Sequence, residues 1–241
     1  MTTPSNGRTY SLARAYGHEC RAAYCNKKRL INHKFCQVHK FRLLFRGHEQ
    51  QVILRPRAIN FALKTVKLLV IDNKGSTAWI DLTEALLQRW ESTRRYVQAH
   101  LDQYYKQGRA KSKWERKGHQ MVADIIQVVG FDRTLEIWAA FQYLKEDSPL
   151  LFIDENSYRH QVIKYLRARA KNYHTSSIDP KTGKPRYYSS VMYTTEREVA
   201  YELLLGIFGA IGLRLHQQLQ VRADRLRANK EQIDRALRAI T

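Results

Sequence analysis

The sequence has few of the residues that cross-link a small chain or interrupt its helices. Among 241 residues there are three cysteines, five prolines and eleven glycines. All three cysteines lie between positions 20 and 36. An odd number of cysteines in so short a segment excludes an ordinary disulfide framework and favours metal binding in a reducing compartment. We therefore expect a cytoplasmic protein.

The sequence also lacks a long apolar run and a recognisable secretory signal. Residues 1–7 are polar and contain no apolar core of a signal peptide. The longest apolar stretch, residues 199–215, is interrupted by Glu202 and Arg214, which leave eleven uncharged residues between them. Because that length is too short to cross a bilayer, we interpret the stretch as a buried helix and expect no membrane partner.

Acidic residues are scarce in comparison with basic ones. Twenty-two Asp and Glu stand against forty-two Lys and Arg, which gives a formal net charge of +20. Such an excess of positive charge is not needed for solubility, and repulsion between the positive side chains destabilises the compact state. It therefore predicts a polyanionic partner. Nucleic acid is the first candidate, because neutralising its phosphates releases counterions. An acidic membrane surface or an acidic protein is the alternative.

Hydrophobic residues recur at helical spacing through most of the chain. A helix is predicted from Pro56, a favoured first-turn residue, with apolar residues at positions 59, 63, 66 and 70. The other helices are expected at 80–107, 119–129, 133–144 and 157–173, with a basic connector at 108–118. The predicted fold is mainly α: a small N-terminal module over residues 1–50, a multi-helix body with basic faces over 51–178, and a last part over 179–241.

The last part is expected to hold a basic loop and a long C-terminal helix. Two prolines and a glycine exclude a regular helix in the polar stretch 176–190. A helix then begins near Thr195, where Glu198 three residues later makes a capping box. This helix either packs on the body or associates with a second copy. The leucines and isoleucines at seven-residue spacing on its seam are Leu219, Leu226, Ile233 and Ile240.

Three cysteines and a histidine dominate the N-terminal module. Cys20, Cys25, Cys36 and His39 follow the pattern C-x4-C-x10-C-x2-H. Zinc takes four tetrahedral ligands, and two close pairs joined by a loop supply them. A closed set predicts one structural zinc ion per chain, which replaces a hydrophobic core that so short a segment cannot build. His18 and His33 lie nearby and leave the fourth ligand open, although His39 has the most suitable spacing.

Residues 18–48 resemble a small module with three cysteines and one histidine that occurs in bacterial and phage proteins. The resemblance rests on the run Cys20-Arg-Ala-Ala-Tyr-Cys25, on Cys36-Gln-Val-His39, and on the following arginine and glycine at 42 and 47. The family usually has glycine where this chain has Lys34. The module often accompanies homing-type HNH nuclease or other DNA-binding domains. The resemblance therefore implies a DNA-binding protein of a phage or mobile element in a bacterial cell.

The sequence supports catalysis weakly. His160, Asn172 and His174 supply the residue types of an HNH site in order, but they fall in a predicted helix that lacks the strand-turn character of such a site. Asp154 and Glu155 have no third carboxylate beside them. No phosphate-binding glycine loop or nucleophile elbow is present. An HNH-type, metal-dependent nuclease is therefore an alternative to the main hypothesis, and we assign no catalytic residue.

Basic segments with interleaved aromatic residues are the expected nucleic-acid contacts, because cations neutralise phosphates and rings stack on bases. Residues 123–138 resemble a helix-turn-helix, but the second helix is so apolar that a core hairpin is the better interpretation. The residues that we expect to contact nucleic acid are Lys40, Arg42 and Arg46 after the cysteines; Arg109, Lys113, Trp114, Arg116 and Lys117 in the connector; Lys164, Arg167, Arg169 and Lys171 in helix 157–173; and Lys181, Lys184, Arg186, Tyr187 and Tyr188 in the loop.

The sequence thus predicts a non-catalytic accessory protein that binds nucleic acid, DNA before RNA, as a regulator or as a subunit of a nucleoprotein complex. The alternatives are the HNH-type nuclease and a structural protein that binds an acidic protein partner. In the last case the C-terminal helix would form the contact between copies.

Overall fold

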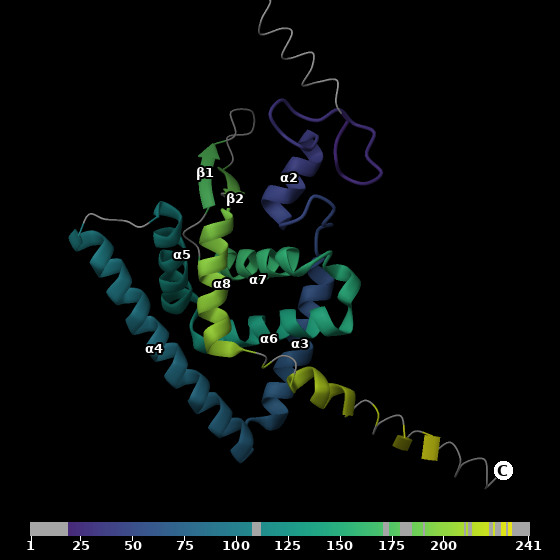
Figure 1. Cartoon of the computed structure of the whole chain (residues 1–241). Helices are drawn as coiled ribbons and strands as arrows, with labels where there is room; N and C mark the ends of the chain where they lie inside the picture. Colours follow the sequence, from purple (N-terminus) through teal and green to yellow (C-terminus); the bar gives the residue numbers. More distant parts are fainter. Residues whose placement is uncertain are drawn as a thin grey trace, which may run out of the picture.

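Figure 1 shows a computed structural model of the chain, in which the Cys/His module lies at one end of a helical body. The structure describes residues 19–107, 112–170, 174–178, 185–189, 191–209, 211, 214–221, 224, 228–229 and 231–232, with the backbone alone at 105–107 and in both strands. The described part is mainly helical and carries the Cys/His group near its N-terminal end, so the predicted fold class is confirmed. None of the described helices is long and apolar enough to cross a membrane.

Seven α-helices are described, together with one turn of π-helix, one turn of 3-10 helix and a β-hairpin. Helix α3 begins at Pro56, as the sequence predicts, because proline is preorganised for the first turn of a helix. The α-helices are α2 (Gln37–Arg46), α3 (Pro56–Asn73), α4 (Thr77–Gln107), α5 (Lys113–Asp124), α6 (Phe131–Asp147), α7 (Glu155–Arg169) and α8 (Thr194–Phe208).

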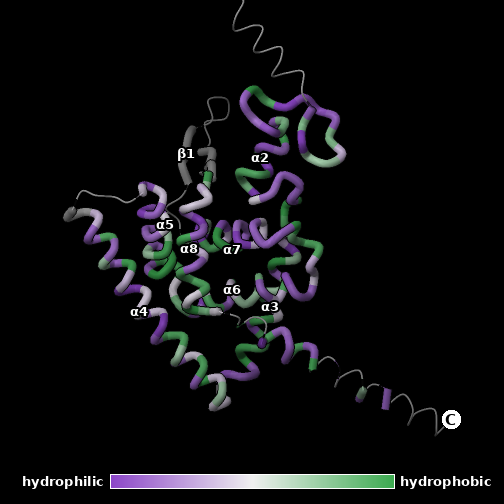
Figure 2. Tube along the Cα trace, in the orientation of Figure 1, coloured by the Kyte–Doolittle hydropathy of each residue, from purple (hydrophilic) through white to green (hydrophobic). Residues whose placement is uncertain are grey.

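Helix α6 is the centre of the body. It packs along α3 and contacts α7, while α5 packs along α8. Trp138 and Phe141 of α6 are fully buried, and the Trp138 indole N–H donates to the carbonyl of Gly209 at 3.2 Å. The apolar helix that resembles a DNA-reading helix is therefore a core element, which confirms its interpretation as packing. Along α4 the hydropathy alternates, as expected of a helix with one buried side (Figure 2).

The predicted connector at 108–118 is wrong over most of its length. Helix α5 begins at Lys113, and the hydroxyl of Ser112 caps it by accepting from the Trp114 backbone N–H at 3.2 Å. Serine at this position satisfies one of the N–H groups that the first helical turn leaves without a partner. Trp114 and the basic residues after it therefore lie on a helix and have fixed neighbours.

The predicted helix 157–173 and loop 176–190 are also corrected. Helix α7 ends at Arg169, and strand β1 (His174–Ile178) pairs antiparallel with β2 (Pro185–Ser189). Pro185 is the first residue of β2, a strand position that proline tolerates, while Pro180 and Gly183 lie outside the described residues. The strands carry Thr, Ile and Tyr, which favour β-structure. Neither strand alternates apolar and polar residues, which is the pattern that predicts a half-buried strand.

The C-terminal helix is not one continuous element. Helix α8 ends at Phe208, Gly209 takes a positive φ of 49°, and the chain is helical again over 214–221. The predicted capping box of Thr195 and Glu198 is wrong, because Tyr193 is the N-cap and its backbone N–H donates to the Glu196 carboxylate. Leu215 is buried against the body, whereas the seam positions beyond 221 have side chains outside the described residues.

Candidate metal centre

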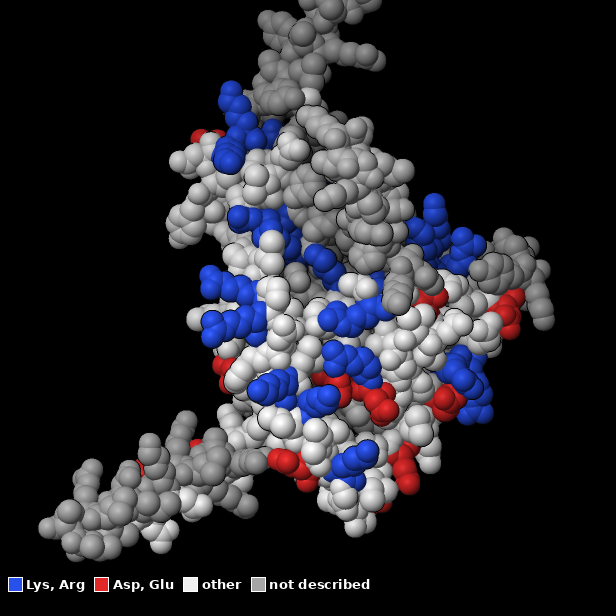
Figure 3. Space-filling view, turned by 180° about the vertical axis from the view of Figure 1, so that it is seen from behind, with Lys and Arg blue, Asp and Glu red and all other residues white. Residues whose placement is uncertain are grey.

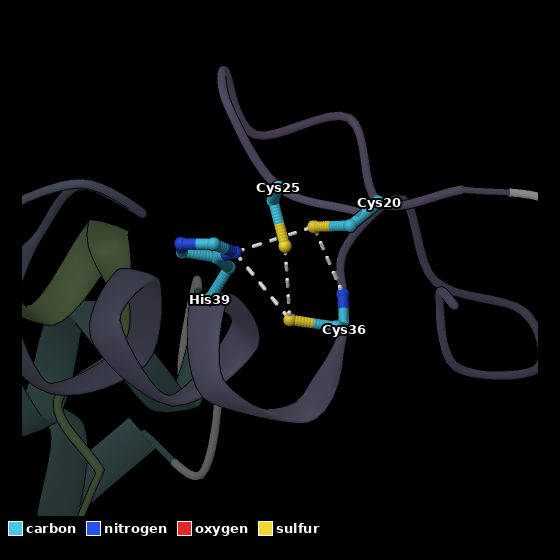
Figure 4. A group of neighbouring side chains, drawn as sticks. All are labelled: Cys20, Cys25, Cys36 and His39. Atoms are coloured by element: carbon cyan, nitrogen blue, oxygen red, sulfur yellow. Dashed lines mark hydrogen bonds between the residues drawn. The ribbon is translucent and has the colours of Figure 1, made fainter. Parts of the chain in front are cut away.

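Cys20, Cys25, Cys36 and His39 come together at the N-terminal end of helix α2 (Figure 4). Their ligand atoms all lie within 4.8 Å of one another, and none of the cysteines forms a disulfide. The Nδ1 atom of His39 lies 3.3 Å from Cys20 Sγ and 3.4 Å from Cys36 Sγ, and the two sulfurs of Cys25 and Cys36 are 3.9 Å apart. These four residues can hold one metal ion.

The local backbone explains why these four side chains converge. Cys36 is the N-cap of α2 and His39 lies three residues further, so both side chains project from the first turn on one side. The first two cysteines lie in a loop whose ends meet where the Cys20 N–H donates to the carbonyl of Lys27 at 2.8 Å. The N–H of Cys36 donates to Cys20 Sγ at 3.2 Å and joins the two halves.

Two groups of the cluster have pKa values shifted toward their metal-binding forms. Burial acts to raise the pKa of the Cys36 thiol, but hydrogen bonds from the His39 backbone, from the Cys20 and Cys25 thiols and from the Val38 backbone outweigh it and lower that pKa. At Cys25 a hydrogen bond from the Lys27 backbone acts to lower the pKa, but burial and the neighbouring thiols raise it. Burial, assisted by the nearby positive charge of Arg42, lowers the pKa of His39 and keeps its imidazole neutral. Thiolate sulfur and neutral imidazole are the forms of these groups that coordinate metals.

The two other candidate histidines do not join the cluster among the described residues. The Nδ1 atom of His33 accepts a hydrogen bond from the Phe35 backbone N–H at 3.1 Å and serves a turn. His18 lies outside the described residues. The structure therefore favours His39 as the fourth ligand.

The module has almost no hydrophobic core of its own. Its buried cluster consists of Cys20, Ala22 and Cys36, with Cys25 and Phe35 packed against it. Three of these five residues belong to the metal-binding group. A metal ion would therefore provide most of the stability that a larger domain obtains from buried apolar area.

Helix α7 holds the module on the body through the C-terminal end of α2. The last carbonyls of a helix have no partner within it. Here Lys164 Nζ donates to the carbonyl of Phe45 at 2.9 Å, and the Gln161 amide donates to that of Arg46 at 3.1 Å. The Asn156 amide donates to the carbonyl of Gly47. The positive charge of Lys164 also suits the negative end of the α2 dipole.

Gln51 fixes the segment that follows the module. Its side chain is completely buried, and its amide donates to the carbonyl of Leu151 at 2.8 Å. Its side-chain oxygen accepts from the N–H of Ile153 at 3.1 Å. Sequence reasoning did not identify Gln51, Asn156 or Gln161, because single amides carry no pattern; the spacing of 156, 160, 161 and 164 on one helix side was the available signal.

The predicted basic contacts divide into accessible and occupied side chains. Lys113 and Lys117 are exposed on α5, and their ammonium groups lie 5.5 and 4.8 Å from the centre of the Trp114 ring. Trp114 in turn stacks on Tyr193, with ring centres 3.6 Å apart. Arg116 beside them is half-buried. Because Lys and Trp are adjacent here, this part of α5 can contact a polyanion.

Three predicted contacts on α7 are engaged within the protein. Lys164 holds the end of α2, and Arg167 is buried with 5% of its surface exposed. Placing both on an accessible phosphate-binding face was therefore wrong. The Arg169 guanidinium lies 3.3 Å from the centre of the Tyr165 ring. Arg167 is buried, whereas Lys164 and Arg169 are half-buried and have a backbone carbonyl and an aromatic ring as partners that compensate their partial desolvation.

The remaining predicted contacts have different positions. Lys40 and Arg42 are half-buried on α2, and Arg46 donates to the carbonyl of Gln51 at 3.0 Å. Arg186, Tyr187 and Tyr188 lie in strand β2, where only the backbone is described. The predicted contacts outside the described residues are Arg109, Lys171, Lys181 and Lys184.

The residues of the HNH alternative do not form an accessible site. His160 has 3% of its surface exposed and is hydrogen-bonded to the backbone of Phe45. His174 begins strand β1, and Asn172 lies outside the described residues. The carboxylate of Asp154 caps α7, and Glu155 binds Lys145 at 2.6 Å. Within the described part of the chain, the Cys/His cluster is the one group of side chains that can hold a metal.

His160 makes the stability of the protein sensitive to acid. Burial, with repulsion from Arg197 and Lys164, lowers the pKa of His160 to about 3, against 6.5 for an ordinary histidine. Between these two pH values the unfolded chain takes up a proton and the folded chain does not. The free energy of unfolding is therefore retained above pH 6.5 and falls by roughly 1.4 kcal/mol per pH unit below it.

Urea unfolding at pH 7 and about pH 5 measures this effect. Replacing His160 by glutamine keeps a hydrogen-bonding side chain and removes the titration, so the wild type should lose roughly 2 kcal/mol more than the variant between the two pH values. The metal ligands are the same in both proteins, so acid release of metal affects both. Equal losses in the two proteins would contradict the role of His160.

Comparisons with protein-family models, with curated proteins and with solved structures found no match to this chain. The resemblance of residues 18–48 to the bacterial and phage module stays a prediction from sequence. The metal-binding group rests on its own geometry. The function must accordingly be argued from the side chains that the fold brings together.

Proposed function

We propose that this protein is a non-catalytic nucleic-acid-binding protein whose N-terminal module is held together by one structural zinc ion. Its partner would be DNA in the first instance. The main observation in support of the proposal is the concentration of positive charge on the N-terminal Cys/His module. Between residues 19 and 50 there are eight Lys and Arg against two Glu.

Zinc is the metal that fits the cluster best. In a tetrahedral site with Zn–S of about 2.3 Å and Zn–N of about 2.0 Å, two sulfurs lie about 3.8 Å apart and sulfur and nitrogen about 3.5 Å apart. The corresponding distances between Cys25, Cys36 and His39 are 3.9 and 3.4 Å. Three thiolates exclude the hard cations that prefer oxygen ligands. Four protein ligands leave no position for a reacting water, which supports a structural role.

The distribution of charge supports a polyanionic partner. Figure 3 shows Lys and Arg from the module down over the body, while most of the Asp and Glu lie in the lower part of that face. On the module, Lys27, Lys28 and Lys34 are exposed. Neutralising phosphates with such side chains releases counterions and gives affinity that depends on salt, whatever the base sequence.

A salt series tests this function. The purified protein should bind a labelled 20-base-pair duplex, and the logarithm of the binding constant should fall linearly with the logarithm of the salt concentration. A double variant, Lys34→Gln with Lys40→Gln, should bind more weakly and show a slope shallower by about 1.8, the value for two lost phosphate contacts on a duplex. Lys67→Gln, an exposed lysine of α3, is the matched control and should leave the slope unchanged.

Polyglutamate of similar length separates nucleic acid from an acidic protein partner. Nucleic acid should compete with the labelled duplex and polyglutamate should compete weakly. Binding that does not change with salt, or equal competition by polyglutamate, would count against nucleic acid as the partner.

A further inference from the structure

A pocket of about 600 Å³ opens beside the metal centre. One wall is the loop between the first two cysteines and the other is the beginning of α2. The Gln50 amide closes its end by reaching the carbonyl of Ala23 at 3.5 Å. Cys25, Cys36 and His39 of the cluster line the pocket, so it opens directly onto the metal-binding group. The other side chains of the lining are Ala23, Tyr24, Asn26, Lys27, Val38, Arg42 and Gln50.

Tyr24 is an unusual residue for its position. Its ring is fully exposed, and its backbone has a positive φ of 61°, a conformation that costs free energy for a residue with a bulky side chain. The turn before Cys25 requires that conformation, but glycine or asparagine adopts it at lower cost. Among the described residues, Asn32 does so at the other positive φ outside glycine, 57°. The turn therefore does not account for an aromatic ring here.

The surroundings of Tyr24 combine an apolar wall with positive charge. Val38 across the pocket has 43% of its surface exposed. Lys27 and Arg42 both line the pocket. Glu49, which precedes the pocket residue Gln50 in the chain, places its carboxylate 3.7 Å from a ring nitrogen of His48. The pocket thus offers an aromatic face, amide groups and two cations.

We propose that this pocket binds one unpaired nucleotide of a single strand. The base would stack on Tyr24 against Val38, the amides of Asn26 and Gln50 would face the base edge, and the phosphate would lie beside Lys27 and Arg42. A base inside a duplex is already stacked and cannot enter. The inference rests on the proposed nucleic-acid binding and specifies its substrate as single-stranded DNA or RNA.

The test compares Tyr24→Gly and wild type on labelled 15-nucleotide oligo-dT, 15-nucleotide oligo-U and a 15-base-pair duplex at one salt concentration. Glycine removes the ring and suits the positive φ, so the module should keep its metal and its stability. Binding of the single strands should weaken about 5- to 100-fold, and binding of the duplex should change less than twofold. The two single strands show whether DNA, RNA or both enter the pocket.

Tyr24→Phe keeps the stacking face and should bind as the wild type does. Tyr96→Ala, a half-exposed tyrosine on α4, is the matched control and should also bind normally. If Tyr24→Gly weakens no strand, or weakens duplex and single strands by the same factor, the pocket proposal fails while nucleic-acid binding stands. If the wild type binds none of the three probes, the proposed function fails and this inference fails with it.

Discussion

Removal of the metal is expected to unfold residues 19–46 while the helices of the body stay folded. The buried core of the module contains three residues, two of which are metal ligands. A structural zinc ion contributes on the order of 10 kcal/mol to such a module at neutral pH. The body has its own core around α6 and does not depend on that contribution. Chelation should therefore abolish hydrogen-exchange protection in α2 and leave it in α5, α6 and α8.

Substitution of a ligand should have the same result as chelation. Metal analysis of the wild type should find about one zinc per chain, and Cys36→Ser should lose it, because a buried hydroxyl replaces one of the three thiolates that the ion needs. His33→Gln is the matched control: His33 lies nearby, serves a turn and should be replaceable without loss of zinc. Full zinc content in Cys36→Ser would show that Cys36 is not a required ligand. Hydrogen-exchange protection of α2 that persists after chelation would show that the metal does not stabilise the module.

Gly47→Ala is expected to be the most damaging single substitution at the junction of module and body. Gly47 ends α2 with a φ of 87°, which an alanine adopts with strain. A Cβ atom at this position would lie 2.6 Å from the Cβ of His160 and 3.0 Å from the backbone of Ser157. Both neighbours belong to α7, whose backbone cannot yield. Strain and overpacking together should cost about 3 kcal/mol and separate α2 from α7.

Two other glycines separate the contributions of strain and contact. Gly130 has a φ of 77° and Gly75 has none in the positive range, and a Cβ at either would meet nothing within 4 Å. Gly130→Ala should cost about 1–3 kcal/mol from strain alone, because φ 77° with ψ 170° is a conformation that essentially only glycine adopts. Gly75→Ala should be neutral or slightly stabilising. Urea unfolding of the three variants gives the comparison. If Gly47→Ala costs no more than about 1 kcal/mol, the strain expected at a left-handed position, the close packing of α2 on α7 is not important for stability.

The metal-binding group and the helical body were predictable because their signals are local or periodic. Four ligands at C-x4-C-x10-C-x2-H spacing indicate one site, and Pro56 with its apolar spacing indicates the start of α3. Gly47 was part of the sequence resemblance, and its positive φ and its packing on α7 now give it a physical reason. The residues of a hydrophobic helix face, or of a ligand pair, lie close together in the sequence, so the sequence alone reveals them.

The junction between module and body was not predictable in the same way. Lys164 and Arg167 were expected on the surface because charged residues are rarely buried; here Arg167 is buried and Lys164 is half-buried and bonded to α2. The compensating partner of Lys164 is a backbone carbonyl at Phe45, which has no sequence signature. The β-hairpin was missed because neither strand alternates apolar and polar residues. Such hydrogen bonds and strand pairings depend on contacts between residues that are distant in the sequence, so a local sequence pattern does not predict them.

The contact between α2 and α7 also sets an order of events during protein synthesis. Gly47 and its partner Asn156 are 109 positions apart in the chain. A ribosome that adds about 5–20 residues per second makes the second roughly 5–20 seconds after the first. During that interval the N-terminal segment lacks the hydrogen bonds that α7 donates to the end of α2. A metal ion bound in that interval would supply most of the stability of the segment, because its own buried cluster holds only three residues.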